Sequence, residues 1–252
     1  MAASYHQLGI VAQDQGRLDD AASWHRKALA IKEELEDRPG MATSYHELGT
    51  VAHMRGRLDD AEDWYSKSLA IEEDFENQPG MATSYHNLGI VAAMRGRLDD
   101  AGDWHRKALA IREDLGDRPA MATSYHQLGM VAQDRGRLDD AEGWYRKALA
   151  IKEDLGDRPG MAISYGQLGL LAEQRGQPRQ ALDWTVRCVT VFREFPHPQT
   201  GPGPDHLARL TAQLGTGALK ASWREVTGGP LPRAVRDYLS SSRSGTGKQQ
   251  RG

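Results

Sequence analysis

Apolar and polar positions follow one another along the chain with helical spacing, and the pattern repeats every 40 residues. A Met-Ala pair opens each of five blocks, and residues 81–120 differ from residues 121–160 at only nine of 40 positions. Periods of about 20–50 residues are typical of solenoids, propellers and other arrays. The repeat therefore indicates the fold class before any single motif is considered.

Each block contains two predicted helices, and the second block illustrates both. Gly56 ends the first helix, as glycine commonly does. Asp59 and Asp60 then begin the second, because carboxylates favour the positive end of a helix. Pro79-Gly80 is expected to stop the second helix and turn the chain into the next block. The apolar stripes, spaced by three and four residues, are Ala42, Tyr45, Leu48, Val51 and Ala52, then Ala61, Trp64, Ser68, Ile71 and Phe75.

Stacking of these pairs is the expected source of stability. A single helix pair cannot cover its own apolar face, so neighbouring repeats must bury it. No segment shows the period-two alternation of a strand. The predicted fold is therefore all-α, a right-handed α–α superhelical solenoid of less than one full turn. Its five helix pairs occupy residues 1–196, in blocks 1–40, 41–80, 81–120, 121–160 and 161–196.

The pattern changes beyond the fifth block. Four prolines from Pro196 to Pro204 predict a Pro-rich linker over residues 197–204. Three short helices with apolar periodicity are expected within residues 205–239. Repeat arrays need an atypical terminal unit with a polar outer face, so these helices are interpreted as a C-terminal cap. Residues 240–252 are polar and glycine-rich, and they predict a disordered tail.

The frame of each block resembles the tetratricopeptide repeat. The residues that carry the likeness in the second block are Tyr45, Leu48-Gly49, Ala52, Ala61, Tyr65, Ser68 and Pro79. The 40-residue length, against the usual length of about 34, and the Gly-Asp turns at 116–117 and 156–157 resemble a subgroup. That subgroup is found in kinesin light chains, Pins/LGN-type polarity scaffolds and many bacterial regulators. The resemblance implies a scaffold that binds a peptide or protein segment in a concave groove built from the first helices.

Charge and cysteine content narrow the class of partner. Lys plus Arg is 32 and Asp plus Glu is 35, which gives no general attraction to nucleic acid or anionic membrane. The chain has neither a signal peptide nor the run of about 18 apolar residues that a membrane span needs. The single cysteine, Cys188, fits a reducing compartment. A cytoplasmic protein with a protein or peptide partner is expected, and the oligomeric state stays open.

Recurring polar residues invite a chemical interpretation, but a structural one is simpler. Equivalent helices lie about 8–10 Å apart, whereas a zinc–nitrogen bond is about 2 Å long; one ion therefore cannot gather the histidine column. Ser44 and His46 point to different sides of a helix and do not form a nucleophile–base pair. We predict no metal, no cofactor and no enzymatic activity. The histidine column is His6, His46, His86 and His126.

The tryptophan column has two interpretations. It could form a platform that stacks on bases or sugars. The tryptophans share the apolar stripe of the second helices, so a packed core role is predicted instead. The column is Trp24, Trp64, Trp104, Trp144 and Trp184.

The groove positions that the resemblance implies differ between blocks, while the packing columns are constant. Variation of this kind is what recognition of a non-repetitive ligand requires, and drift at exposed positions is the alternative. The central blocks carry His53, Met54 and Met94 where outer blocks carry Gln and Asp. Methionine adapts to irregular apolar ligands, and histidine both donates and accepts hydrogen bonds. The predicted protein-binding residues are His46, Thr50, His53, Met54, His86, Ile90, Ala93, Met94, His126 and Met130.

A second function class follows from the same resemblance. Similar bacterial arrays lie downstream of nucleotide-binding switch domains or act as peptide-pheromone receptors. Met1 coincides with the methionine of the repeat, and no N-terminal cap precedes it. The chain is therefore alternatively expected to be the C-terminal sensor or regulatory portion of a larger bacterial signalling protein.

Overall fold

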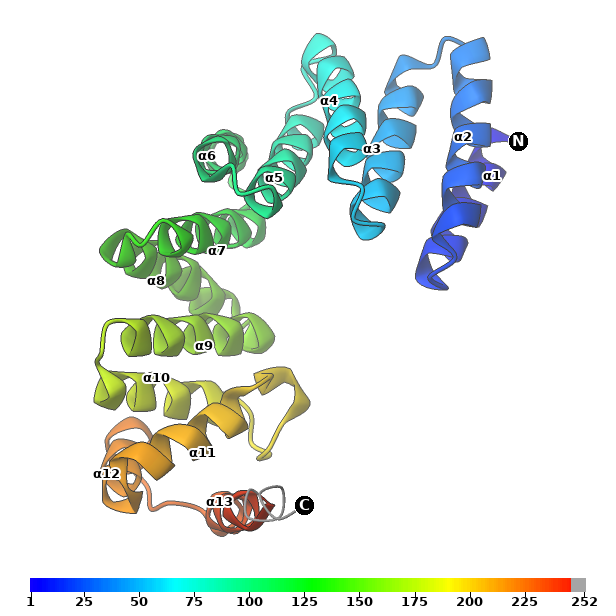
Figure 1. Ribbon diagram of the computed structural model, residues 1–252. Helices are drawn as coiled ribbons and strands as arrows, with labels where there is room; N and C mark the ends of the chain where they lie inside the picture. Colours follow the sequence, from blue (N-terminus) through cyan, green and yellow to red (C-terminus); the bar gives the residue numbers. More distant parts are fainter. Residues whose placement is uncertain (246–252) are drawn as a thin grey trace. The chain divides into compact units, whose positions relative to one another are not determined.

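The computed structural model describes residues 1–245. Over that range the chain is helical, without strands, and it forms two compact units, Met1–Arg135 and a second from Gly136 onward (Figure 1). The first unit contains α1 (Ala2–Asp14), α2 (Leu18–Glu34), α3 (Arg38–Met54), α4 (Leu58–Asp74), α5 (Gln78–Met94), α6 (Leu98–Asp114) and α7 (Arg118–Asp134). The second contains α8 (Leu138–Leu155), α9 (Arg158–Gln174), α10 (Pro178–Thr190), the short 3-10 helix η1 (Pro198–Thr200), α11 (Gly203–Leu214), α12 (Thr216–Thr227) and α13 (Arg233–Gly245).

Helices pack in chain order within each unit. From α1 to α7, and again from α8 to α10, each helix contacts the next. The prediction of an all-helical array of successive helix pairs is confirmed. None of the helices in the described range is both long and apolar enough to cross a lipid bilayer.

The prolines begin helices instead of ending them. Pro79 lies in the first turn of α5, which Asn77 caps by accepting a hydrogen bond from the backbone N–H of Gly80 at 3.4 Å. Asp117 caps α7 in the same way through Ala120, at 3.0 Å. The predicted role of Pro79-Gly80 as a helix stop was therefore wrong. The first N–H groups of a helix have no intrahelical partner, so proline costs nothing there.

Two kinds of turn alternate along the array. Gly56 ends the first helix of its pair at φ 71°, in the left-handed region, as predicted. The turn between pairs also needs a positive φ. Gly116 and Gly156 supply it at 67° and 66°, whereas Glu36 and Glu76 adopt 53° and 52° in the equivalent turns.

The core is built from small residues where helices cross and, in the first four repeats, from one large residue beside the tryptophan. Ala61 and Ala101 are fully buried, and Tyr65 is 2% exposed. Trp64 is only half-buried: it packs on the edge of this cluster and stacks on Tyr45, with ring centroids 5.6 Å apart. The predicted core role of the tryptophans is corrected accordingly. Tyr65, the next residue along the helix, lies at the centre of the cluster, and Trp64 lies at its edge.

A buried polar contact joins successive repeats. Lys32 Nζ donates to the Ser44 hydroxyl at 2.9 Å, and Lys152 Nζ makes the same contact with Ser164 at 3.0 Å. Ser44 is completely buried, so its hydroxyl belongs to the repeat interface. An exposed ion pair between Arg55 and Asp19 joins the same two repeats.

The C-terminal helices pack on the last repeat. α10 contacts both α11 and α12. Leu182 and Val186 of α10 share one cluster with residues that α11, α12 and α13 contribute, among them Leu207, Leu219 and Val235. Two of the segment boundaries predicted from the sequence differ from those in the structure.

Those two differences concern α11 and α13. The predicted linker at 197–204 already contains η1 and the start of α11 at Gly203. The predicted disordered tail at 240–252 is helical up to Gly245, and the Ser240 and Ser241 hydroxyls in it donate to the backbone carbonyls of Asp237 and Tyr238. The remainder of that tail, residues 246–252, lies outside the described range.

Candidate functional site

The ten predicted binding residues recur at equivalent positions of α3, α5 and α7, and we call them the first-helix strip. Met54 and Met94 are 51% and 55% exposed, and Met130 is 39% exposed. The remaining seven are half-buried, namely His46, Thr50, His53, His86, Ile90, Ala93 and His126. The strip thus offers exposed methionine side chains beside half-buried polar and apolar groups.

The α3 and α5 parts of the strip meet directly. His53 Nε2 lies 3.2 Å from Met94 Sδ. Thr50, by contrast, accepts a hydrogen bond from the Tyr65 hydroxyl at 3.3 Å and donates to the His46 carbonyl at 3.1 Å. Thr50 therefore serves helix packing first, whereas Met54 and Met94 are exposed and His53 contacts Met94.

The histidine column lies against rings of the second helices. The rings of His46 and Tyr65 are tilted with centroids 5.6 Å apart, and those of His86 and His105 are 5.5 Å apart. Burial lowers the pKa of His46, and burial together with Arg112 lowers the pKa of His86 to about 4. These imidazoles are therefore neutral near pH 7. Within the described residues no group of three His, Cys, Asp or Glu side chains is placed to hold a metal ion.

Sequence reasoning missed two buried histidines beneath this column. His25 and His105 are 0% exposed, in the position that Tyr65 occupies in the second repeat. A Cβ atom on Gly89 would lie 2.6 Å from Cε1 of His105. The glycine that is present in all five blocks signals this close approach, since only glycine leaves room for the ring.

A cavity of about 490 Å³ opens beside His46, between α3, the end of α4 and the start of α5. Thr43, Ile71 and Thr83 line it together with Phe75, which is 52% exposed. His46 is the one predicted site residue that lines this cavity. The strip is therefore continued by an apolar hollow at the N-terminal ends of α3 and α5.

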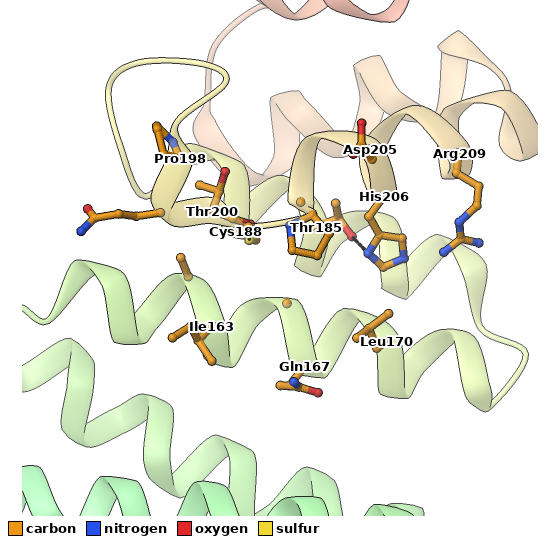
Figure 2. A pocket seen from close by; sticks show the side chains of 16 residues that line it. Ile163, Gln167, Leu170, Thr185, Cys188, Pro198, Thr200, Asp205, His206 and Arg209 are labelled. Atoms are coloured by element: carbon orange, nitrogen blue, oxygen red, sulfur yellow. Dashed lines mark hydrogen bonds between the residues drawn. The ribbon is translucent and has the colours of Figure 1, made fainter. Parts of the chain in front are cut away.

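A second cavity, of about 560 Å³, lies in the other unit between α9, α10 and the segment 198–209. Figure 2 shows Ile163, Gln167 and Leu170 projecting from α9 on one side, with Pro198 and His206 on the other. The predicted site did not include this cavity. Its sequence signal is the departure of the fifth block from the other four at these columns.

Polar side chains at this cavity are hydrogen-bonded to one another. His206 Nε2 lies 2.6 Å from a carboxylate oxygen of Glu173. Its Nδ1 lies 3.3 Å from the Thr185 hydroxyl (Figure 2). Arg209 donates two hydrogen bonds to the same carboxylate, at 2.7 and 2.6 Å. Hydrogen bonding from Arg209, assisted by His206, keeps the pKa of Glu173 below its usual value despite burial. The carboxylate is thereby compensated, which leaves a mainly apolar cavity wall.

Paired helices in succession, with variable exposed residues on the first helix of each pair, define a helical repeat protein. The family model described as "Tetratricopeptide repeat" matches residues 1–74, 80–154 and 120–194. The chain belongs to the tetratricopeptide repeat family. No curated protein sequence matches it.

Solved structures share the fold at low identity. Kinesin light chain TPR-like repeats from Podosopora anserina align with a TM-score of 0.65 and 20% identity, over 75% of this chain and 93% of that one. A Rap protein complexed with Competence and Sporulation Factor gives 0.66 and 16%, over 95% and 66%. A STAND protein with a tetratricopeptide repeat sensor from Pyrococcus horikoshii gives 0.75 and 15%, over 96% and 38%. The expected likeness to kinesin light chain repeats is confirmed for the fold.

Proposed function

We propose that the chain is a protein-interaction module whose first-helix strip binds a peptide or protein segment. The observation that supports this most directly is the exposure of Met54 and Met94 on neighbouring helices, with His53 in contact with Met94. Apolar groups that gather on a surface favour a partner that covers them. Methionine adapts to an irregular apolar ligand, so an amphipathic helix or an extended segment with apolar anchors fits the strip.

The charge of the strip predicts how binding responds to salt and pH. None of its ten residues is Lys or Arg, so salt should change affinity little. Because the pKa of His86 is lowered to about 4, this ring gains a proton only in strongly acidic solution. Protonation of His86 should therefore repel a basic ligand only as the pH approaches about 4.

The experiment begins with a pull-down on the whole chain and identification of captured proteins by mass spectrometry. Met54→Asp with Met94→Asp should then lower affinity for the direct binder by at least about tenfold, since a buried apolar anchor contributes about 1.5–3 kcal/mol. The matched control is Ser66→Asp with Ala110→Asp, at exposed positions of the second helices in the same repeats. Full affinity in the methionine variant, with loss in the control, would place the binding surface on the second helices.

A second candidate is a sensor portion of a larger cytoplasmic signalling protein. The Rap complex and the STAND sensor favour it, and this chain spans 38% of the STAND protein. Cys188 is a free, buried thiol, which is compatible with a reducing compartment. An immunoblot of source cells should show a band well above 27.9 kDa. A band at that mass alone would contradict this candidate.

A further inference from the structure

The fifth repeat lacks two rings that earlier repeats bring together. His6 lies against His25 with centroids 5.6 Å apart, and the second and third repeats keep this arrangement at 5.6 and 5.5 Å. In the fifth block the two positions hold Gly166 and Thr185. A Cβ atom on Gly166 would meet no atom within 4 Å. Space that a histidine ring fills elsewhere is therefore open here.

The adjoining segment closes this space only in part. His206 enters from α11 on the side of the missing second-helix ring, but less closely. A Cβ on Gly169 would lie 3.6 Å from His206 Cε1, whereas one on Gly9 would lie 2.4 Å from the His25 ring. Together with the 198–203 segment, His206 encloses the cavity of about 560 Å³. That volume is within the range of about 300–1,000 Å³ typical of ligand pockets.

The rim of the cavity is also more apolar than the equivalent surface of the preceding repeats at one position. Ile163 stands where the three preceding blocks have threonine, and it is 52% exposed. Leu170, one further helical step of seven residues along α9, is 43% exposed. Both ring nitrogens of His206 lie at hydrogen-bond distance from a partner, Glu173 or Thr185. An apolar group entering the cavity would therefore bury Ile163 and Leu170 beside an imidazole that already has its polar partners.

We propose that this cavity receives an aromatic side chain of a peptide ligand, whose ring lies where the histidine rings lie in the first three repeats. The inference deepens the proposed peptide-binding function and rests on it. An aromatic ring matches the shape of the missing imidazole, faces the ring of His206, and has a large area to bury against Ile163 and Leu170. Gln167 also lines the cavity, and its amide carries both a donor and an acceptor for a peptide backbone.

The test uses the whole chain and N-acetyl-phenylalanine amide, with the leucine and alanine analogues beside it. Methyl resonances of Ile163 and Leu170 should shift saturably with the phenylalanine probe, with a Kd of about 1 mM, as expected for one anchoring group. The leucine analogue should bind several-fold more weakly, and the alanine analogue should produce no saturable shift. Equal binding of leucine and phenylalanine, or no shift with phenylalanine, would overturn the aromatic assignment.

Two variants introduce the residues that other repeats carry at the same positions, and they test whether the phenylalanine probe binds in this cavity. Gly166→His restores the ring present in four blocks and should weaken phenylalanine binding at least about tenfold, and Ile163→Thr should weaken it less. Gly143→His is the matched control, because a Cβ there also meets nothing within 4 Å but lies on the exposed side of α8. Unchanged binding in Gly166→His would overturn the proposal. The probe needs no natural partner, so its failure would leave the Met54 and Met94 test of the strip unaffected.

Discussion

His105 is completely buried, and neither of its ring nitrogens is bonded to another protein group in the described part of the chain. Burial lowers its pKa to about 3 and that of His25 to about 4. Histidine in an unfolded chain titrates near about 6.5. Between these values the unfolded state binds more protons than the folded state, so the free energy of unfolding falls as the pH drops below about 6.5.

Replacing His25 and His105 by tyrosine should reduce this acid sensitivity. Tyrosine already fills the equivalent position at Tyr65 and Tyr145, which are almost fully buried. Each histidine contributes a slope of up to about 1.4 kcal/mol per pH unit below its unfolded pKa. Urea unfolding between pH 7 and pH 4.5 should show a shallower loss of stability in the double variant. The same slope in both proteins would show that other groups dominate.

The second prediction at the residue scale concerns the glycine in each first helix that packs against the second helix. A Cβ on Gly49 would lie 2.7 Å from the Tyr65 ring. Gly49→Ala should therefore destabilise the protein by about 1–3 kcal/mol, the usual cost of overpacking. Gly143→Ala, where a Cβ meets nothing within 4 Å, should instead stabilise it by about 0.5–1 kcal/mol through helix propensity. Thermal unfolding of the two variants should shift in opposite directions, and a stabilised Gly49→Ala would contradict the close packing.

At the scale of the helices, the turns between repeats differ in the conformational free energy of their backbone. Glu36 and Glu76 adopt φ 53° and 52°, whereas Gly116 and Gly156 occupy the equivalent turns without strain. A side chain in the left-handed region costs about 1–2 kcal/mol. Part of that cost is offset because glycine loses more backbone freedom on folding.

Glu36→Gly and Glu76→Gly should each raise the free energy of unfolding by about 0.5–1 kcal/mol. The reverse change, Gly116→Glu, should lower it by a similar amount, and both are measured by urea unfolding. All three residues are exposed, so side-chain packing does not affect the comparison. Stabilisation by Gly116→Glu would mean that backbone strain is not what distinguishes these turns.

At the scale of the whole molecule, the C-terminal helices are expected to act as the cap of the array. Leu207 and Leu219 are 0% exposed and cover Leu182 and Val186 of α10. Deleting residues 205–252 would expose that helix face to water. Leucine-to-alanine changes in such a cluster cost about 2–5 kcal/mol each, so the truncated chain should unfold at a much lower temperature or aggregate.

Point variants make this prediction independent of truncation. Leu219→Ala should lower the melting temperature, whereas Leu35→Ala, at a side chain 70% exposed, should leave it nearly unchanged. Light scattering and calorimetry check both. An unchanged melting temperature and a monodisperse product after deletion of 205–252 would argue against a capping role.

The sequence by itself determined the elements. Helical spacing is a local property, and five repetitions reinforce it, so ten helices in successive pairs and three C-terminal helices followed directly. It also predicted Met54 and Met94 as protein-binding residues, and both side chains are exposed. Whether those positions bind a partner stays a prediction. The role of Pro79 was misjudged because a proline between two helices is compatible with ending one or beginning the next.

Only the tertiary structure decided which of two neighbouring stripe residues is buried. Trp64 and Tyr65 both belong to the apolar side of α4, and the packing of α3 through Gly49 places Tyr65 at the centre. The cavity beside Gly166 likewise depends on His206, which comes from α11 forty residues later. Periodicity describes one helix at a time, whereas burial and cavities depend on how neighbouring helices are placed.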